Sequence, residues 1–285
     1  MGRIHYNIEK YSPRQLVILP LVILILSLLL IFMNMAATGM PVRPGIDFSG
    51  GTAVTLSTSE SADQLRSTFA SYPLTEISEG VNNGKFLKFG AMDDAQFRAL
   101  STLVNQHYPD AKIDQIGESF GKTLQQQALL ALVFSFIGMA VVIFIAFRTL
   151  VPAAAVVISA FADIVMTAAM MNLIGIPLTL GTTAALLMLI GYSVDSDILL
   201  TNRVLKRQGK LIDKLKGAFD TGISMTSTTL AAIAAMLIVS WIGSVEILMQ
   251  ISAVLLIGLV FDVMNTWLTN VAILKWYVQK GGSRQ

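Results

Sequence analysis

Four aspartates lie within or beside long apolar runs of this chain: Asp163, Asp195, Asp197 and Asp262. A carboxylate at the centre of a lipid bilayer costs about 2.5–3.5 kcal/mol, so such groups are kept where they face a protein interior, a water-filled cavity or a partner chain. No lysine or arginine lies at the same depth in these runs. The carboxylates can therefore take up protons or other cations, or accept hydrogen bonds from neighbouring helices.

A cluster of hydroxyl side chains lies in another apolar run and consists of Ser224, Thr226, Ser227 and Thr228. At 1.5 Å per helical residue, the hydroxyls and the aspartates fall at overlapping depths in four different spans. Such a polar layer either conducts protons or other cations, or bonds the helices together with about 0.6 kcal/mol for each hydrogen bond. The residues alone leave both interpretations open.

Two of the aspartates are separated by only one residue. Because a helix turns by 100° per residue, Asp195 and Asp197 point about 200° apart. They cannot face the same neighbour, so one is expected to face this bundle and the other a partner chain. Asp197 lies closer to the basic segment 203–216 and is expected to pair with it.

Apolar helices must position these side chains. Hydrophobic residues make up 54% of the 285 residues and charged residues only 13%, which is about half the charged fraction of a soluble protein. Six apolar stretches can cross roughly 30 Å of hydrocarbon. They are residues 16–35, 126–147, 151–171, 178–200, 218–240 and 247–274. The predicted fold class is an α-helical polytopic membrane protein with six transmembrane helices.

Positive charge gathers on one side of these spans, as expected for the cytoplasmic side. Thirteen of the 20 basic residues fall in the N-terminal segment, the second link, the fourth link and the tail, whereas the short links on the other side hold none. The sequence predicts a multi-pass protein of the cell membrane with both termini in the cytoplasm. The first span resembles a signal peptide because Ala36 and Ala37 follow it, but its apolar run is longer than usual, which favours an uncleaved anchor.

Residues 36–124 are expected to form one external α/β domain between the first and second helices. Strands are predicted at 52–58, 74–81, 85–89 and 111–116, and helices at 61–72 and 93–107. Ser61 and Gln64 predict a capping box, and Asn82-Asn83-Gly84 predicts a hairpin turn. The order βαββαβ predicts a ferredoxin-like sandwich. The chain then divides into 1–35 (N-terminus and first helix), 36–124 (external domain), 125–274 (helices two to six) and 275–285 (cytoplasmic tail).

No arrangement of side chains typical of an enzyme appears, and no cofactor or metal site is expected. The chain has no cysteine, and neither His5 nor His107 has neighbours suited to metal ligation. Residues 45–51 (GIDFSGG) could suggest a phosphate-binding loop, but a strand is predicted after them, so a turn entering the external domain is favoured. The basic run 203–216 is explained by its cytoplasmic side, and we expect contact with membrane lipid but not with nucleic acid.

Several motifs carry a resemblance that covers essentially the whole chain. GIDFSGG follows the first span, IGESFG leads into the second, FADI lies in the third, and GYSVDSD at 191–197 lies in the fourth. Together they resemble the SecD/SecF family of protein-export membrane proteins, and the length of the chain, with one small external domain, favours the SecF branch. The motif positions are Gly45, Asp47, Gly50, Gly51, Gly191, Tyr192, Ser193, Asn202 and Arg203.

The resemblance implies an accessory subunit of the Sec protein translocase. The implied partners are a SecD-like subunit, a SecYEG-type translocon and the translocating polypeptide, and export is expected to be coupled to an ion gradient through the aspartates. The family is similar to the resistance–nodulation–division transporters, so a small-molecule or lipid exporter is one alternative. A passive scaffold for SecD, with the aspartates as bonds between helices, is another.

The chain departs from the bacterial pattern of this family at two places. Bacterial members carry an aspartate where this chain has Ser196, and an arginine in the fifth span near Met225. These substitutions look like the archaeal branch, and the bacterial aspartate–arginine pair cannot form here. Glycines in three of the spans are interpreted as close-packing points. They are Gly191, Gly222 and Gly258.

Overall fold

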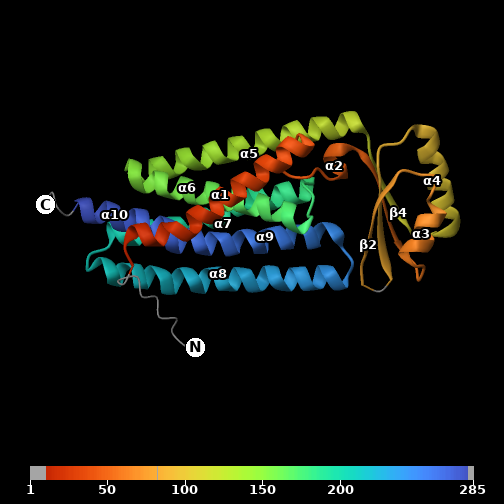
Figure 1. Ribbon diagram of the computed structural model, residues 1–285. Helices are drawn as coiled ribbons and strands as arrows, with labels where there is room; N and C mark the ends of the chain where they lie inside the picture. The colour runs from red at the N-terminus through yellow and green to blue at the C-terminus, as the bar shows by residue number, and fades with distance from the viewer. Residues whose placement is uncertain (1–10, 82, 282–285) are drawn as a thin grey trace.

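The computed structural model describes residues 11–81 and 83–281. A long helical bundle carries a small α/β domain at one end (Figure 1). The start of α1 (Pro13–Thr38) and the end of α10 (Val271–Gly281) both lie at the opposite end of the bundle (Figure 1). Some residues used in the sequence predictions lie outside the described residues: Arg3, His5, Lys10, Asn82 and Arg284.

Six helical segments are long and apolar enough to cross a membrane, which confirms the predicted number. They are α1, α5 (Glu118–Phe147), α6 (Leu150–Ile174), α7 (Leu180–Lys206), α8 (Leu211–Ile242) and a last segment made of α9 (Glu246–Met264), the π-helix η2 (Asn265–Asn270) and α10. The helix α5 begins well before the predicted residue 126. An ion pair of 2.8 Å between Glu118 and Lys122, one turn apart, favours helix there.

Local signals at the helix ends set several of these bounds. Ser12 caps α1, because its hydroxyl accepts a hydrogen bond from the Gln15 N–H while the Gln15 side chain accepts one from the Ser12 N–H. Thr179 and Thr182 form the equivalent capping box at the start of α7. The helix α6 ends before Gly175, whose φ of 78° lies in the left-handed region that favours glycine.

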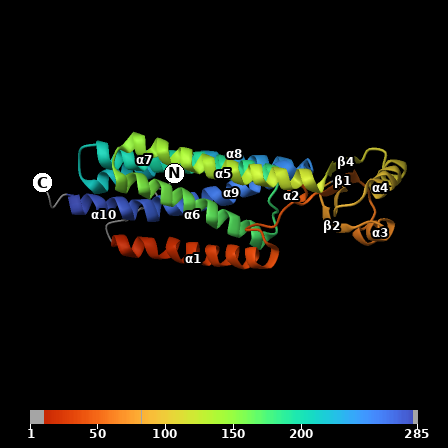
Figure 2. The same cartoon turned by 90° about the horizontal axis from the view of Figure 1, so that it is seen from above.

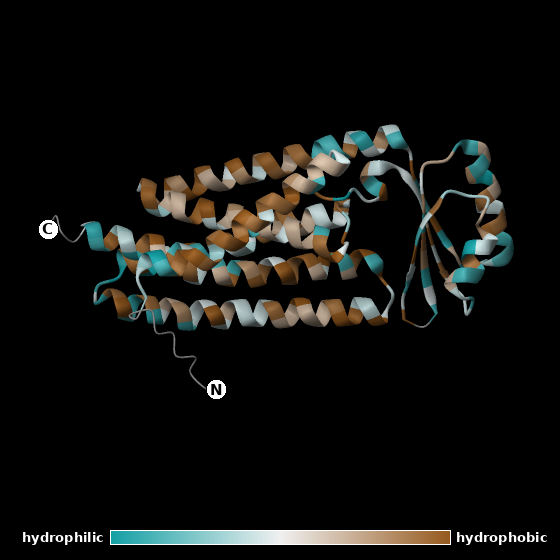
Figure 3. Cartoon of the chain, in the orientation of Figure 1, coloured by the Kyte–Doolittle hydropathy of each residue, from teal (hydrophilic) through white to brown (hydrophobic). Residues whose placement is uncertain are grey.

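The helices α6 and α7 form the centre of the bundle. In their most apolar windows 61% and 56% of the residues are buried, against 6% for α5 and 17% for α1 and α8. The helix α9 packs against α6, α7 and α8, and α1 runs along α6 at the edge (Figure 2). The helices α1, α5 and α8 consist largely of hydrophobic residues (Figure 3). Many of their apolar side chains are exposed, as is typical of membrane spans.

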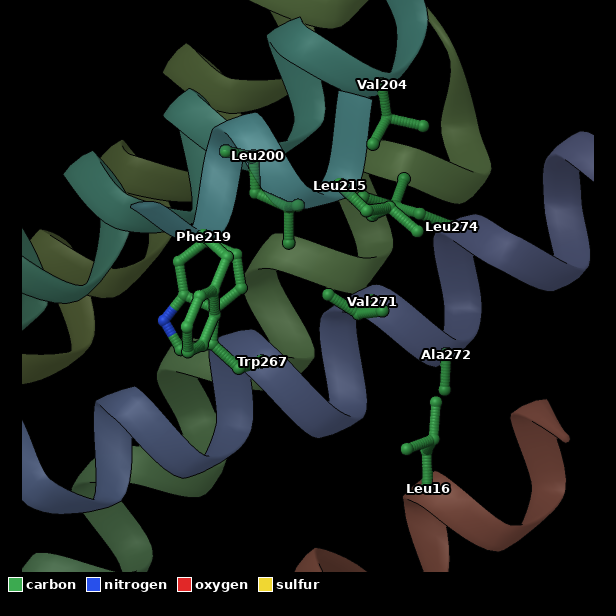
Figure 4. Packing of buried hydrophobic residues seen from close by; sticks show 10 residues of the cluster. Leu16, Leu200, Val204, Leu215, Phe219, Trp267, Val271, Ala272 and Leu274 are labelled. Carbon is green, nitrogen blue, oxygen red and sulfur yellow. The ribbon is translucent and has the colours of Figure 1, made fainter. Parts of the chain in front are cut away.

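Apolar side chains fill the end of the bundle far from the small domain, where α1, α7, α8, η2 and α10 meet (Figure 4). Phe219 and Trp267 pack edge to face with their ring centroids 5.0 Å apart. The indole also lies against Gly222, where an added Cβ would collide with it. These contacts fix α8 against the π-helical part of the last span.

The three glycines predicted as close-packing points differ. A Cβ at Gly222 would collide with Trp267, and a Cβ at Gly258 would lie 2.5 Å from the Leu189 side chain, so both are close-packed as predicted. A Cβ at Gly191 would meet nothing within 4 Å. The prediction is therefore wrong for Gly191, because that residue lies on the exposed face of α7.

The small domain contains a four-stranded antiparallel sheet in the order β2-β3-β1-β4. Its strands are β1 (Gly51–Ser57), β2 (Leu74–Glu79), β3 (Gly84–Phe89) and β4 (Lys112–Ile116). The helices α3 (Ala62–Thr68) and α4 (Asp94–His107) cover one face of the sheet (Figure 1). Leu65, Phe69, Leu87 and Leu100 lie in the core between the helices and the sheet. The elements follow the predicted order β-α-β-β-α-β.

The local signals predicted for this domain are present. Ser61 and Gln64 form the capping box that begins α3, and Asp93 caps α4 together with Gln96. The turn between β2 and β3 holds Asn83 at a φ of 60°, a conformation that asparagine tolerates better than most residues. The hairpin therefore follows from residues that lie next to one another in the chain.

Residues 45–51 do not form the simple turn that was predicted. A single helical turn, α2 (Ile46–Ser49), precedes β1. The carbonyl of Gly45 accepts hydrogen bonds from the N–H groups of Phe48 and Ser49, at 3.1 and 3.0 Å, and closes this turn. Gly50 and Gly51, with φ of 74° and 139°, then lead the chain into the strand, which a residue with a Cβ would do only under strain.

Three polar contacts join the small domain and α2 to the ends of the central helices. The Asp47 carboxylate accepts a hydrogen bond of 2.7 Å from the Leu180 N–H at the start of α7, where the helix dipole favours negative charge. The Lys88 ammonium lies 3.0 Å from Glu246 in the first turn of α9. Ser244 donates a hydrogen bond of 2.9 Å to a backbone carbonyl in the β2–β3 turn. The domain is thus attached directly to α7 and α9.

Candidate functional site

Asp163 lies near the middle of α6 and is fully buried. Each of its carboxylate oxygens accepts one hydrogen bond, from Ser193 Oγ at 2.6 Å and from Asn265 Nδ2 at 2.7 Å. The two donors belong to α7 and η2, so this carboxylate joins three helical segments. Its burial is compensated by neutral donors.

Asp262 lies close to the end of α9 and is 1% exposed. Ser196 Oγ lies 3.1 Å from its Oδ2 and 3.2 Å from its Oδ1, and Thr266 Oγ1 lies 3.2 Å from its Oδ1. Ser196 is the residue that the motif resemblance aligns with an aspartate of bacterial relatives. In this chain its hydroxyl can donate to a carboxylate supplied by α9.

Asp197 is fully buried and points into the bundle. Its Oδ1 accepts hydrogen bonds from Thr266 Oγ1 and Asn270 Nδ2, both at 2.8 Å. The prediction that it pairs with the basic segment 203–216 is wrong, because its side of α7 faces η2. Arg203 of that segment donates to α8 instead, to Thr221 Oγ1 at 2.7 Å.

The π-helix η2 supplies most of the donors in this network. Its buried polar side chains are Asn265, Thr266, Thr269 and Asn270. A π-helix has i→i+5 hydrogen bonds, so residues 265 and 270 return to the same face. The sequence suggested Asn265 and Asn270 as neighbours of Asp262, whereas they donate to Asp163 and Asp197. Sequence reasoning did not name Thr266 or Thr269. The available signal was the polar run NTWLTN inside an apolar span.

The three buried carboxylates form one connected group. Thr266 Oγ1 lies within hydrogen-bond distance of both Asp197 and Asp262, and Ser193 and Asn265 join Asp163 to the same two segments, α7 and η2. All the donors named above are neutral. No group of three or more histidine, aspartate or glutamate side chains suited to a metal ion occurs within the described ranges. The arrangement can relay protons through the hydroxyl groups. It can also hold a cation, because neutral donors do not balance the negative charge of the carboxylates.

Asp195 lies on the opposite side of α7 and is exposed, in keeping with the 200° separation from Asp197. It lines a cleft of about 70 Å³ together with Tyr192 and two residues of the buried group, Ser196 and Asp262. This volume holds about two water molecules. The cleft therefore connects the exposed face of α7 to the buried carboxylates.

The predicted hydroxyl cluster lies mostly away from the buried carboxylates. Ser224, Ser227 and Thr228 are exposed, and only Thr226 is buried, where it lines the cleft. Ser227 and Thr228 donate to backbone carbonyls of their own helix, at 3.1 and 2.7 Å. The expectation of one polar layer that includes all four hydroxyls is therefore wrong. The rotation of α8 about its axis turns most of the cluster outward.

The remaining motif residues fall at two places. Gly45, Asp47, Gly50 and Gly51 shape and attach α2. On the outer face of α7, Asn202 and Arg203 line a cavity of about 530 Å³ together with Asp195, and Tyr192 is exposed nearby. Ser193 alone among them faces inward, toward Asp163.

The chain is similar to several known proteins. The family described as protein export membrane protein SecD/SecF, C-terminal, matches residues 96–280. The chain is 57% identical over 282 residues to the protein-export membrane protein SecF of Methanolacinia petrolearia, covering 99% of this chain and 100% of that one. It is 41% identical to the protein of the same name from Haloferax volcanii, covering 96% of each chain.

Among solved structures, the chain is similar to SecDF from Thermus, described as a translocon-associated membrane protein. The TM-score is 0.70 at 21% identity, and the match covers 93% of this chain but 38% of that one. SecDF in a super-membrane-facing form matches with a TM-score of 0.57 at 19% identity. These likenesses show the fold, and this chain spans well under half the length of either structure.

Proposed function

Because this chain belongs to the SecD/SecF family of protein-export membrane proteins, in its SecF branch, we propose that it is an accessory subunit of the Sec translocase that acts with a SecD-like subunit. The observation that carries the proposal is the connected group of Asp163, Asp197 and Asp262 at the centre of the bundle. Carboxylates at such positions are costly and are kept for function or for partners. We propose that they couple export to an ion gradient.

The outer face of α7 is the proposed contact surface for the SecD-like subunit. It presents the exposed carboxylate of Asp195, the ring of Tyr192 and the cavity of about 530 Å³. A carboxylate facing lipid is unfavourable, and a second bundle would cover it. The match to 38% of the Thermus SecDF chain supports the idea that another chain supplies the remainder.

We further propose that the small domain is ferredoxin-like and lies outside the cell, with both termini in the cytoplasm. The strand order β2-β3-β1-β4 and the two helices on one face of the sheet support the ferredoxin-like fold. The ends of α5 and α7 that carry Arg148 and Arg203 lie at the end of the bundle far from the small domain (Figure 1). Because basic residues gather on the cytoplasmic side, this supports an external domain and cytoplasmic termini.

The contacts between the domain and the helices provide a route for mechanical coupling. Asp47 touches the start of α7 and Lys88 the start of α9, and both helices carry the buried carboxylates. A change in ion occupancy that shifts α7 against α9 would change the posture of the small domain. The domain would then draw or release the emerging polypeptide beside a SecYEG-type translocon.

Secretion of a reporter protein tests the proposal. Deletion of the gene is expected to slow export, and the wild-type gene is expected to restore it. Asp163→Asn is expected to assemble with the SecD-like subunit but to restore export poorly. Normal export after deletion at every temperature contradicts an export role.

The export assay and two further measurements separate the alternatives. Full export with Asp163→Asn, but none after deletion, selects a passive scaffold in which the aspartates only bond helices together. Ligand-stimulated counter-transport in vesicles selects a small-molecule or lipid exporter. Co-purification of a SecD-like chain or of translocon subunits from native membrane supports the proposed assembly.

A further inference from the structure

The cavity of about 530 Å³ between α7 and α8 gathers positive charge. Three of its lining residues are basic: Arg203, Lys206 and Arg207. None of them forms an ion pair with a carboxylate among the described residues. Asp195 supplies one negative charge to the lining, so three positive charges face one negative charge. This excess favours an anionic ligand.

The general excess of basic residues on the proposed cytoplasmic side explains why such residues occur here, but not why they share one cavity. Arg203 lies one turn before the end of α7. Its guanidinium is held against α8, because Nη2 donates to Thr221 Oγ1 at 2.7 Å and Nη1 donates to the carbonyl of Gly217. Lys206 and Arg207 follow at spacings of three and four residues, on the same side of α7. Both are exposed, so the three cations are arranged around one position.

An unpaired acceptor lies beside these cations. Asn202 lines the cavity, and its buried Oδ1 has no hydrogen-bond partner among the described residues. Buried polar atoms are nearly always paired, so this oxygen indicates a missing donor. Lysine and arginine side chains only donate, whereas an amide oxygen only accepts. A ligand that carries both a negative charge and a hydroxyl group would satisfy the cations and Asn202 together.

The deeper part of the cavity is apolar. Ile198 and Leu199 of α7 and Met225 of α8 line it, and Met225 is 48% exposed. Ile198 and Leu199 precede Arg203 by about 6–8 Å along the helix axis, toward the middle of the span. Positive charge therefore lies at the end of the span and apolar surface lies below it, which matches a phospholipid with its headgroup above its acyl chains. A soluble phosphate compound would cover only the basic part.

We propose that this cavity binds an anionic phospholipid whose headgroup carries hydroxyl groups, as a phosphoglycerol headgroup does. The phosphate lies among the three cations, a headgroup hydroxyl donates to Asn202 Oδ1, and the acyl chains pass along Met225. Basic pockets between transmembrane helices on the cytoplasmic side are known to suit such headgroups. The volume of about 530 Å³ lies within the range of about 300–1,000 Å³ that is common for small-ligand sites.

This inference goes beyond the proposed function. The cavity belongs to the face of α7 that we propose for the SecD-like subunit, so the lipid fills a hollow beneath that subunit. Lipid binding itself needs neither the subunit nor export. It is measured on the purified, full-length chain, so its failure and the failure of the proposed export role are distinguishable.

Native mass spectrometry of the chain in detergent, titrated with phosphatidylglycerol and phosphatidylcholine, provides the test. Phosphatidylglycerol is expected to occupy one site at least about tenfold more tightly than phosphatidylcholine, which has no net charge, because each nearby basic residue strengthens binding of an anionic lipid about fivefold. Glycerol 3-phosphate, which has the phosphate but no acyl chains, is expected not to displace the lipid.

Two matched double variants separate a defined site from general attraction to basic residues. Lys206→Gln with Arg207→Gln removes two exposed cations of the cavity and is expected to weaken phosphatidylglycerol binding by at least about tenfold. The control is Lys210→Gln with Lys216→Gln, which removes two exposed lysines that follow in the chain but are not part of the cavity lining. It is expected to change the affinity by less than about twofold.

Equal losses of affinity in the two double variants would show a diffuse attraction of lipid to the basic segment and would overturn the proposal. Equal binding of the two lipids, or displacement by glycerol 3-phosphate, would overturn it as well. A cavity that only the SecD-like subunit fills would leave the isolated chain without any bound phosphatidylglycerol, which is a further contradicting result.

Discussion

The two faces of α7 differ sharply although they belong to the same helix. Asp197 is fully buried and accepts hydrogen bonds from Thr266 and Asn270, whereas Asp195 is exposed beside Tyr192 and lines the cleft. A rotation of about 200° separates them. One short motif thus supplies a carboxylate to the interior and another to the surface, and this difference is why we propose ion handling for the inner face and partner contact for the outer face.

The largest expected effect is on folding and separates the two aspartates. Asp197→Leu removes the acceptor of the Asn270 amide in the interior, at a cost of about 1–3 kcal/mol, and leaves Thr266 with Asp262 as its remaining carboxylate acceptor. Asp195→Leu removes an exposed group and should change the free energy of unfolding of the isolated chain by no more than about 0.5 kcal/mol. Unfolding of both variants in detergent measures the difference. Equal losses of stability would show that the two faces do not differ as described.

Substitutions at two glycines compare a closely packed position with an exposed one. Gly222→Ala places a Cβ against the indole of Trp267 and should destabilise the chain by about 1–3 kcal/mol. Gly191→Ala, on the exposed face of α7, meets nothing within 4 Å and should be neutral or stabilising by up to about 1 kcal/mol, because alanine favours helix. The thermal midpoints of the two variants provide the measurement, and a stable Gly222→Ala protein would contradict the packing of α8 on η2.

The ion pair between Lys88 and Glu246, which helps to attach the small domain, should weaken as the pH rises in the alkaline range. Burial lowers the pKa of Lys88, but Glu246 and Glu76 more than offset this effect and leave the pKa above its ordinary value of 10.5. A raised folded-state pKa means that the stabilisation is fully present below pH 10.5 and is lost as the pH rises through the folded-state pKa. The protection of the amides in β3 and in the first turn of α9, measured relative to the base-catalysed intrinsic exchange rate, should therefore fall as the pH rises above 10.5.

A double-mutant cycle with Lys88→Met and Glu246→Gln checks this ion pair at neutral pH. A coupling energy of up to about 1 kcal/mol is expected for a partly exposed pair. Additive effects of the two substitutions would show that the pair does not hold the domain.

The smallest effects are expected on the outer face of α8. Ser227→Ala and Thr228→Ala remove hydroxyls that are exposed and donate only to their own helix. Each should alter the free energy of unfolding by less than about 0.5 kcal/mol. A loss comparable to that of Asp197→Leu would place these hydroxyls in the buried network after all.

Sequence reasoning succeeded where the signals were local. Apolar length set the six helices, and adjacent residues set the capping box of Ser61 and the hairpin at Asn83. Helix geometry also predicted that Asp195 and Asp197 face different neighbours. It could not decide which one faces inward, because both sides of α7 carry polar and apolar residues.

The predictions that failed share a physical cause, which is packing between segments that are distant in the sequence. The outward rotation of the hydroxyls of α8 could not be read from a helix whose apolar residues cover most of its circumference. The π-helix η2 depends on contacts of Asn265 with α6 and of Asn270 with α7. The turn of helix in α2 depends on Gly45, whose N–H donates to the carbonyl of Leu178, far away in the sequence.

The rate of reporter export in cells whose sole copy of this gene carries Asp163→Asn tests the central claim most directly. The amount of chain that co-purifies with its partner is held equal to wild type, and Asp220→Asn, which removes an exposed carboxylate on α8, serves as the control. Since Asp163 is one of the three connected carboxylates, the rate is expected to fall well below that of the control. An export rate equal to that of the control would show that these buried carboxylates only bond helices together.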